Sequence, residues 1–339
     1  MSAQTAESSP LTIAVIKPCC IGDCVMALPA IQSLAAAFPL AHIHAYAGRH
    51  SAPIFRASEH VSRVYLSPDQ LNAARMPGMA WNLRTAGHDW IVLLDRSRWL
   101  IAAARGAAPR KLVKLSSSRS KPRHEIDVYL DALEAVGVRT PFNVPRLTPG
   151  SDARESAAAA LGSTEQSFVV LQPGGAENPG ASMLDKRWPA IHYVHLARTL
   201  AERGLRPVLT GGLSDVELCV QIANEIANLK PVMLAGRLDI MTSAAVIEQA
   251  SLYVGTDTGI SHLAAAVGTP TIVIFGPTNP LRYAPRGDRV KILSPASSRT
   301  LPEIDLRKVT ESTSLPSTAD VSVDEVIDAY DNLMENSSR

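Results

Sequence analysis

The feature that most constrains the fold is an alternation of short apolar runs with helical segments, clearest over residues 254–280. A first strand is expected to end at Gly255, and the apolar run TIVIF at 271–275 predicts a second one. Between them, the polar turn of 256–259 opens a short Ala-rich helix that Gly268 ends. This order predicts a parallel strand-helix-strand unit.

The same alternation runs through the rest of the chain. Further strands are expected at 11–16, 42–46, 61–66, 90–94, 168–172, 207–210 and 231–234. Helices are expected at 24–38, 124–136, 192–203, 215–226, 241–250 and 323–334. A chain of 339 residues is too long for one ordinary core, and its pattern loosens between 141 and 162. We therefore predict an α/β protein with two domains, at 1–164 and at 165–339, the second ending in a tail helix.

Composition excludes several classes of protein. The net charge is +1, so nothing in the bulk composition indicates a nucleic acid partner. No apolar run is long enough to span a membrane, and the polar start lacks the features of a secretion signal, which predicts a cytoplasmic protein. Cys19, Cys20 and Cys24 fall within six residues, but no second pair of metal ligands is visible elsewhere. We expect reduced, partly buried thiols and no metal.

Polar and flexible residues gather in four loops that follow predicted strands. The loops are Gly22-Asp23, Pro173-Gly174-Gly175 with Lys186 beyond it, Gly211-Gly212 with Asp215, and Asp257-Thr258-Gly259 with His262. In open parallel sheets this edge binds ligands, and helix starts there suit a phosphate or diphosphate. The dinucleotide fingerprint, the P-loop and the nucleophile elbow are all absent, which weakens dehydrogenase, P-loop and hydrolase interpretations.

A basic segment lies at 105–123 and contains seven Lys or Arg residues but no acidic residue. One interpretation is a solvated basic loop. The other is a docking surface for an anionic acceptor, in which Arg110, Lys111 and Lys114 would take part. The sequence alone leaves both open.

Three motifs resemble those of a known family. IKPCCIGDCVMALPAIQSLAAAFP at 16–39 resembles the N-terminal motif of the bacterial ADP-heptose:lipopolysaccharide heptosyltransferases, glycosyltransferase family 9. DKRWP at 185–189 resembles their lysine-tryptophan motif, and GTDTGISHLAAAVGTPTIVIFGPTNP at 255–280 resembles their nucleotide-sugar motif. The resemblance implies a GT-B fold, with two Rossmann-like domains facing a cleft. It also implies acceptor binding by the first domain, nucleotide-sugar binding by the second, and an inverting transfer that needs no metal.

The resemblance assigns a role to Asp23, which matches the family's catalytic aspartate. An inverting transfer needs a base within hydrogen-bond reach of the acceptor hydroxyl. Asp23 also stands at a predicted helix start, where it could serve only as a cap. The match to the family favours the base.

The remaining assignments concern the donor. Lys186, Thr258 and Gly259 would stabilise the departing diphosphate, although most lysines are simply solvated. Gly174 and Gly175 would let the backbone approach the diphosphate, or form an ordinary turn. The resemblance places Asp257 and His262 near the sugar and diphosphate, and Asp215 and Leu238 near the base and ribose.

We therefore expect a glycosyltransferase that uses ADP-heptose or another nucleotide sugar as co-substrate and needs no cofactor. The acceptor would be a glycan or glycolipid such as lipopolysaccharide, met at the inner membrane face. Two alternatives stay open: another GT-B enzyme, either a UDP-sugar transferase or a nucleotide-sugar epimerase, and a non-catalytic nucleotide-sugar-binding protein.

Overall fold

A computed structural model describes residues 10–116, 123–162, 166–175, 177–178, 181–301 and 315–335. Contacts divide these residues into two compact units. Unit 1 comprises the described parts of 1–20, 27–118 and 126–143. Unit 2 comprises 21–26 and the described parts of 119–125 and 144–339. The predicted domain boundary at residue 164 lies outside the described residues and stays a prediction.

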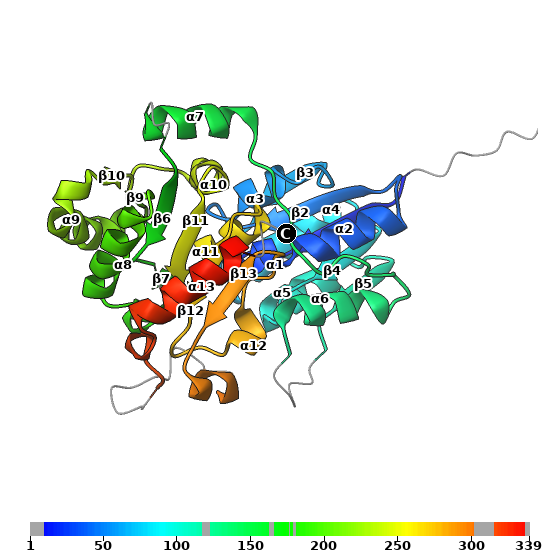
Figure 1. Cartoon of the computed structure of the whole chain (residues 1–339). Coiled ribbons are helices and arrows are strands. Elements are labelled where there is room, and N and C mark those ends of the chain that lie inside the picture. Colours follow the sequence, from blue (N-terminus) through cyan, green and yellow to red (C-terminus); the bar gives the residue numbers. More distant parts are fainter. Residues whose placement is uncertain are drawn as a thin grey trace, which may run out of the picture. The chain divides into compact units, whose positions relative to one another are not determined.

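Unit 1 is built on a five-stranded parallel sheet (Figure 1). Its strands are β1 (Thr12–Ile16), β2 (His42–Ala47), β3 (Arg63–Leu66), β4 (Trp90–Leu93) and β5 (Lys111–Lys114). They lie in the order β3-β2-β1-β4-β5, and every neighbouring pair is parallel. The helices are α2 (Leu28–Ala37), α3 (Ala52–Arg56), α4 (Met76–Thr85), α5 (Arg98–Gly106) and α6 (Glu125–Glu134).

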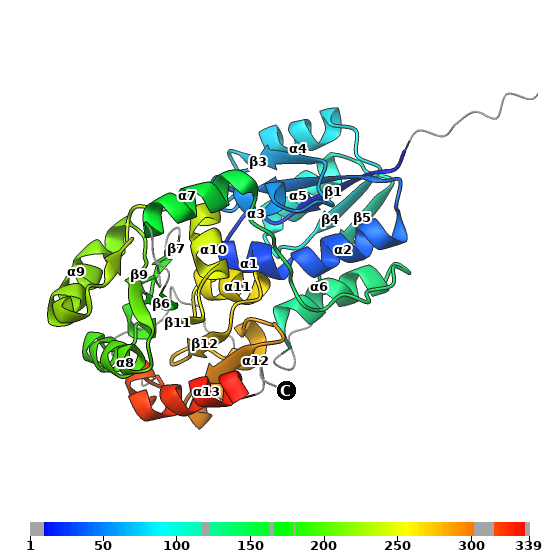
Figure 2. The same ribbon diagram turned by 45° about the horizontal axis from the view of Figure 1, so that its top comes forward.

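Alternation along the strands places helices on both faces of this sheet. Ala14 and Ile16 of β1 pack with Leu83 of α4 and with Leu100 and Ala103 of α5, and all five side chains are buried. Helices α2 and α6 lie on the opposite face (Figure 2). Burial on both faces explains why β1 is apolar throughout rather than alternating.

Strand β5 corrects one expectation. One of the two interpretations of segment 105–123 was a solvated basic loop, yet Lys111–Lys114 pairs with β4 as an edge strand. Only Val113 is buried, and the lysines at both ends are exposed. Short strands with exposed lysines are typical of sheet edges, where they prevent pairing with other chains. Four residues with this composition give too little apolar pattern to predict a strand.

Unit 2 is built on a six-stranded parallel sheet in the order β10-β9-β6-β11-β12-β13. The strands are β6 (Phe168–Gln172), β9 (Arg206–Leu209), β10 (Val232–Met233), β11 (Leu252–Thr256), β12 (Thr271–Ile274) and β13 (Val290–Leu293). A separate antiparallel pair consists of β7 (Glu177–Asn178) and β8 (Ala181–Ser182). The edge strand β13 was not predicted, and all four of its residues are only partly buried.

The helices of unit 2 again cover both faces of its sheet. They are α1 (Ile21–Met26), α7 (Ser151–Leu161), α8 (Ala190–Glu202), α9 (Val216–Glu225), α10 (Ile240–Glu248), α11 (Gly259–Ala266), α12 (Pro280–Tyr283) and α13 (Val323–Glu335). Val169 and Leu171 pack with residues of α8, α9 and α13. Val170 and Tyr253 pack with residues of α7, α10 and α11. In the described part of the chain, no helix is both long and apolar enough to cross a membrane.

Both sheets have a switch point, where the chain leaves two neighbouring strands in opposite directions. In unit 1, β1 leads to β2 on one side while β4 leads to β5 on the other. In unit 2, β6 leads to β9 while β11 leads to β12. Ligands of open α/β sheets bind outside the carboxyl ends of such strand pairs. The fold therefore marks one candidate ligand position in each unit.

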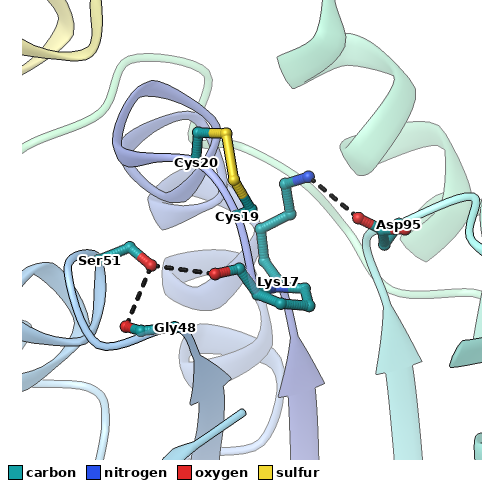
Figure 3. The surroundings of a disulfide bond; sticks show 7 residues. Lys17, Cys19, Cys20, Gly48, Ser51 and Asp95 are labelled. Carbon is teal, nitrogen blue, oxygen red and sulfur yellow. Dashed lines mark hydrogen bonds and ion pairs between the residues drawn. A yellow bond between two sulfur atoms is a disulfide. The ribbon is translucent and has the colours of Figure 1, made fainter. Parts of the chain in front are cut away.

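The cysteines differ from expectation at one place. A disulfide joins Cys19 and Cys20 just after β1 (Figure 3), so reduced thiols were the wrong expectation for this pair. Cys24 and Cys219 are buried and form no disulfide, as expected. Burial raises the pKa of Cys219 to about 12, so its thiol stays protonated at neutral pH.

Candidate active site

The carboxyl edge of the unit 2 sheet carries a short ion pair. Lys186 ends a 3₁₀ turn, η1 (Leu184–Lys186), and Asp257 directly follows β11. Lys186 Nζ lies 2.6 Å from Asp257 Oδ2, and the two side chains are 12% and 9% exposed. The alternative of a solvated surface lysine is therefore excluded for Lys186. A nearly buried pair of this geometry is held in one place before any ligand arrives.

Thr278 is a second donor to the same carboxylate oxygen. It lies in the loop between β12 and α12, is buried, and donates from Oγ1 to Asp257 Oδ2 at 2.7 Å. Burial pushes the pKa of Asp257 upward. The Lys186 ammonium and the hydrogen bonds from Lys186 and Thr278 outweigh burial, so the pKa is lowered overall. Asp257 is thus an anion at neutral pH and orients Lys186 rather than acting as an acid.

His262 stands beside this pair, in the first turn of α11. It is 5% exposed, and its ring makes a hydrogen bond with the backbone of Tyr283. Burial lowers the pKa of His262, while the negative charges of Asp257 and Asp23 oppose that shift. The imidazole is therefore neutral at pH 7, and it lies within electrostatic reach of both carboxylates and of Lys186. His262 therefore interacts electrostatically both with the predicted donor residues Lys186 and Asp257 and with the predicted base Asp23.

Asp23 lies on α1, which packs against α11 within unit 2. The two helices approach so closely that a Cβ on Gly22 would lie 2.9 Å from Cδ2 of His262. A Cβ on Gly259 would lie 2.7 Å from Cβ of Ile21. Asp23 itself is partly exposed in the first turn of α1, so it is inside the helix rather than at its cap position. Glycine at 22 and 259 lets the two helix starts meet.

A second buried carboxylate, Asp215, organises the glycine loops. Its Oδ1 accepts from the amide of Gly175 and from Nη2 of Arg187, both at 2.9 Å, and its Oδ2 accepts from the amide of Gly212 at 2.8 Å. A Cβ on Gly174 would overlap this carboxyl group, at 2.1 Å from Cγ. Asp215 is only 2% exposed, so the contacts that it makes here are with the protein's own loops.

The other predicted donor residues lie on the same edge. Thr258 precedes α11, and Gly259 begins it. Gly175 has a φ of +88°, a conformation that side chains rarely adopt, and a Cβ there would lie 2.7 Å from Thr258 Cγ2. Leu238 is partly buried next to the core behind β10. The loops after β6, β10 and β11 thus converge on the carboxyl edge of the unit 2 sheet.

The predicted docking residues of unit 1 do not lie together. Lys111 pairs in register with Trp90 at the amino ends of β5 and β4, and Lys114 pairs with Leu93 at their carboxyl ends. Arg110 lies with Lys111 at the amino end, where its Nη1 is 3.3 Å from Oδ1 of Asp89. The structure therefore puts two of the three on the edge opposite the switch point. Arg119 and Lys121 of the same segment lie outside the described residues.

Three contributors to the unit 2 site were missed from the sequence. Thr278 and Arg187 belong to the matched motifs, but nothing in their residue types signals which carboxylate each one holds. The third contributor is the tail: Thr318 Oγ1 donates to the carbonyl of Arg187 at 2.8 Å, and the indole N–H of Trp188 donates to the carbonyl of Val321 at 2.9 Å. These contacts join segments over 130 residues apart, which no local pattern predicts.

Comparisons with known proteins agree with the geometry. The model of "Glycosyltransferase family 9 (heptosyltransferase)" matches residues 97–312. Lipopolysaccharide heptosyltransferase 3 of Escherichia coli is 26% identical over 322 residues, covering 84% of this chain and 89% of that protein. Lipooligosaccharide heptosyltransferase 2 of Haemophilus ducreyi is 27% identical over 312 residues, covering 84% and 88%.

Solved structures confirm the predicted GT-B fold class. A glycosyltransferase family 9 structure from Veillonella parvula has a TM-score of 0.80 at 20% identity, covering 96% of this chain and 97% of that one. ADP-heptose LPS heptosyltransferase II of E. coli has a TM-score of 0.79 at 19% identity, covering 97% and 100%. At sequence identities this low, the likeness shows a shared fold and no more.

Proposed function

The chain belongs to glycosyltransferase family 9 and is a glycosyltransferase; from this premise we propose that it transfers a heptose from ADP-heptose to a lipopolysaccharide-type glycan acceptor, by an inverting reaction in which Asp23 is the base. Relatives named lipopolysaccharide and lipooligosaccharide heptosyltransferases support the substrate class. A heptosyltransferase structure solved with ADP supports the nucleotide. We place the acceptor at the inner membrane face.

One observation carries this proposal. The charges of Asp23, Asp257 and Lys186 all act on the pKa of His262, which lies in the nucleotide-sugar motif. Three motifs that lie far apart in the sequence therefore supply groups to one small region of unit 2. A partly exposed carboxylate can act as the base, and a separate paired lysine can stabilise the leaving group, which are the two functions that an inverting transfer needs.

In the proposed reaction, Asp23 removes the proton from an acceptor hydroxyl. The acceptor oxygen then forms a bond to the anomeric carbon of heptose from the face opposite the diphosphate. The bond from that carbon to the diphosphate oxygen breaks, and ADP leaves with the electron pair. The configuration at the anomeric carbon is thereby inverted.

Lys186 serves the leaving group in this scheme. Its Nζ donates to Asp257 Oδ2 at 2.6 Å and to the carbonyl of Asp257 at 3.5 Å, and these contacts fix the position of the ammonium. A preorganised ammonium stabilises the charge that develops on the departing diphosphate without reorganising during the reaction. The amides at the start of α11, at Thr258 and Gly259, would supply further donors. This charge stabilisation from the chain's own residues is why we propose a transfer that needs no metal.

The proposal is tested by incubating the purified chain with ADP-heptose and a lipopolysaccharide core that lacks the transferred heptose. Release of ADP together with a mass gain of one heptose on the acceptor is the expected result. A matched thermal-shift series with ADP-, GDP-, UDP- and dTDP-sugars identifies the donor, since a ligand at 100 times its Kd stabilises the fold by about 2.7 kcal/mol. Stabilisation by a UDP-sugar alone, with transfer from it, would overturn the ADP-heptose assignment. Sugar release without any acceptor would overturn the transfer.

A further inference from the structure

A second ion pair of unit 2, beside Lys186, has no part in the reaction proposed above. Arg187 Nη2 lies 2.9 Å from Asp215 Oδ1, and the two side chains are 21% and 3% exposed. Arg187 directly follows the turn η1 that ends at Lys186, and Asp215 ends the 3₁₀ turn η2 (Leu213–Asp215) beyond β9. The pair therefore joins two loops at the carboxyl edge of the sheet.

This ion pair also holds both polar groups of the Gly175 backbone. The amide of Gly175 donates to Asp215 Oδ1 at 2.9 Å, and Arg187 Nε donates to the carbonyl of Gly175 at 3.3 Å. Gly175 has a φ of +88°, in the left-handed region that glycine adopts without steric strain. A glycine has many accessible conformations, so the hydrogen bonds to the pair select one of them.

The carboxylate of Asp215 is enclosed by the protein. Its Oδ2 accepts from the amide of Gly212 at 2.8 Å, in addition to the contacts of Oδ1. A Cβ on Gly174 would lie 2.1 Å from Asp215 Cγ, and a Cβ on Gly211 would lie 2.7 Å from Asp215 Cβ. The glycines let the two loops close around the carboxyl group. This arrangement favours a role in positioning the loops over direct contact with a ligand.

The loop that the pair holds lies against the start of α11. A Cβ on Gly175 would lie 2.7 Å from Thr258 Cγ2, and Thr258 directly precedes α11. The loop follows β6 and Thr258 follows β11, so they meet at the switch point of the unit 2 sheet. Phosphate groups bind where backbone amides of a glycine loop and of a helix start converge. The conformation of Gly175 therefore determines the shape of this place.

The backbone of Arg187 is itself held in place. Its amide donates to the carbonyl of Leu184 at 2.8 Å, and its carbonyl accepts from Thr318 Oγ1 at 2.8 Å. The guanidinium thus extends from a backbone position that the tail segment helps to fix. A planar guanidinium on a fixed backbone can donate to Asp215 and to Gly175 at the same time.

We propose that Arg187 and Asp215 are positioning residues, whose ion pair holds the Gly174–Gly175 loop in the conformation that binds the diphosphate of the donor. The inference rests on the proposed function, because it takes the donor to be a nucleoside diphosphate sugar. The pair acts through the backbone of Gly175 and raises affinity for the diphosphate. Lys186 instead stabilises the charge that develops during the reaction.

The test compares ADP with adenosine, which has the same base and ribose but no phosphate. Binding of each to the full chain is measured by isothermal titration calorimetry. Arg187→Met removes the guanidinium, and the loss of charge-assisted hydrogen bonds should raise the Kd for ADP at least about tenfold. The Kd for adenosine should stay within about twofold, because the loop serves the phosphates. Unchanged ADP binding, or an equal loss for adenosine, would overturn the proposal.

Two further variants separate this role from general loss of stability. Arg154→Met is the matched control, since Arg154 of α7 donates two hydrogen bonds of 2.8 Å to Glu248 of α10, and it should bind ADP as the parent does. Arg187→Met leaves the buried Asp215 without its counter-charge, which destabilises the fold. The double variant Arg187→Met/Asp215→Asn removes that charge, and it should show the same selective loss of ADP binding.

Amide hydrogen exchange tests the effect on the loop without any nucleotide. In the ligand-free chain, the Gly175 amide should exchange faster in Arg187→Met than in the parent, because its local structure opens more readily. Arg154→Met should exchange there as the parent does. Unchanged exchange at Gly175 would overturn the proposal whatever nucleotide binds. Failure of the parent to bind ADP would count against the proposed function instead.

Discussion

The two units each have a lysine-aspartate pair at the switch point, and the two pairs are built differently. In unit 2, Lys186 and Asp257 are 2.6 Å apart, and the side chains are 12% and 9% exposed. In unit 1, Lys17 and Asp95 are 3.4 Å apart, and the side chains are 7% and 23% exposed. Thr278 adds a side-chain donor to Asp257, whereas the further donor to Asp95 among the described residues is the backbone amide of Ser97.

The difference shows how each edge meets a ligand. The unit 2 pair is short, nearly buried and braced by a third group, which preorganises Lys186 for charge that develops during the reaction. The unit 1 pair is longer, and its carboxylate is the more exposed of the two aspartates although its lysine is buried. The longer distance holds the two charges less tightly, so this pair is less suited to fixing one reaction geometry. We therefore expect substitutions in unit 2 to change turnover and those in unit 1 to change acceptor affinity.

Among substitutions that test this comparison, the largest expected effect is the loss of the lysine from the unit 2 pair. Lys186→Met removes the ammonium and leaves Asp257 buried with Thr278 as its remaining side-chain donor. We expect kcat/KM for the donor to fall by about 10²–10³, as is usual when a preorganised electrostatic group is lost. Steady-state kinetics with the donor varied at fixed acceptor measure this loss.

Lys17→Met is the matched control for that prediction. It removes the equivalent lysine from the unit 1 pair, so it should raise the KM for the acceptor while the KM for the donor stays within about twofold. If Lys17→Met lowers kcat/KM for the donor as much as Lys186→Met does, the two pairs do not differ in role as described. Thermal denaturation of both variants separates loss of fold from loss of function.

The next effect concerns how the free energy of unfolding depends on pH, because unit 1 also contains a buried histidine, His88. His88 precedes β4 at the amino edge and is hydrogen-bonded to Tyr46 Oη at 2.8 Å. Burial, with a contribution from His44, lowers the pKa of His88 from 6.5 to about 4, against the opposing charge of Asp89. The neutral ring is thus favoured by folding. The contribution of His88 to the free energy of unfolding is fully present above pH 6.5 and is lost as the pH falls toward 4.

His88→Phe should flatten this dependence. At about 1.4 kcal/mol per pH unit, the folded state should lose about 3 kcal/mol between pH 6.5 and 4 through His88. Urea denaturation at a series of pH values measures the free energy of unfolding for both proteins. A variant curve as steep as that of the parent would show that His88 is not the group responsible.

The smallest effect concerns Thr278, which donates a hydrogen bond to the Asp257 carboxylate of the unit 2 pair. Thr278→Val keeps the shape of the side chain but removes the donor to Asp257, and we expect kcat to fall about tenfold. That hydrogen bond helps to lower the pKa of Asp257, so the acid limb of the pH–rate profile should move upward in the variant.

Thr278→Ser is the control, since it keeps the hydroxyl, and it should restore both kcat and the acid limb. A merely structural role would lower the stability of Thr278→Val without moving the acid limb. In that outcome Thr278 would not position the pair.

Much of the fold and part of the site could be predicted from the sequence. The buried central strands are continuous apolar runs, and their helices have a clear period, so the regions of β1, β6 and β11 were predicted. Edge strands β5 and β13 have few buried residues, and their apolar signal is correspondingly weak. Lys186 and Asp257 came from motifs, but they lie 71 residues apart, so their pairing depends on tertiary packing. The contacts of Thr278 and Thr318 follow from tertiary packing alone, and the Cys19–Cys20 disulfide was not expected.

The proposed mechanism depends most on Asp23 as the base, and one substitution tests this role directly. Asp23→Asn keeps the size of the side chain and removes its ability to take a proton. Transfer is measured as ADP release and as product mass, and donor affinity is measured in parallel by thermal shift. We expect kcat to fall by about 10²–10⁴ while donor affinity stays within about twofold. Turnover at the parent's rate in Asp23→Asn would contradict the account.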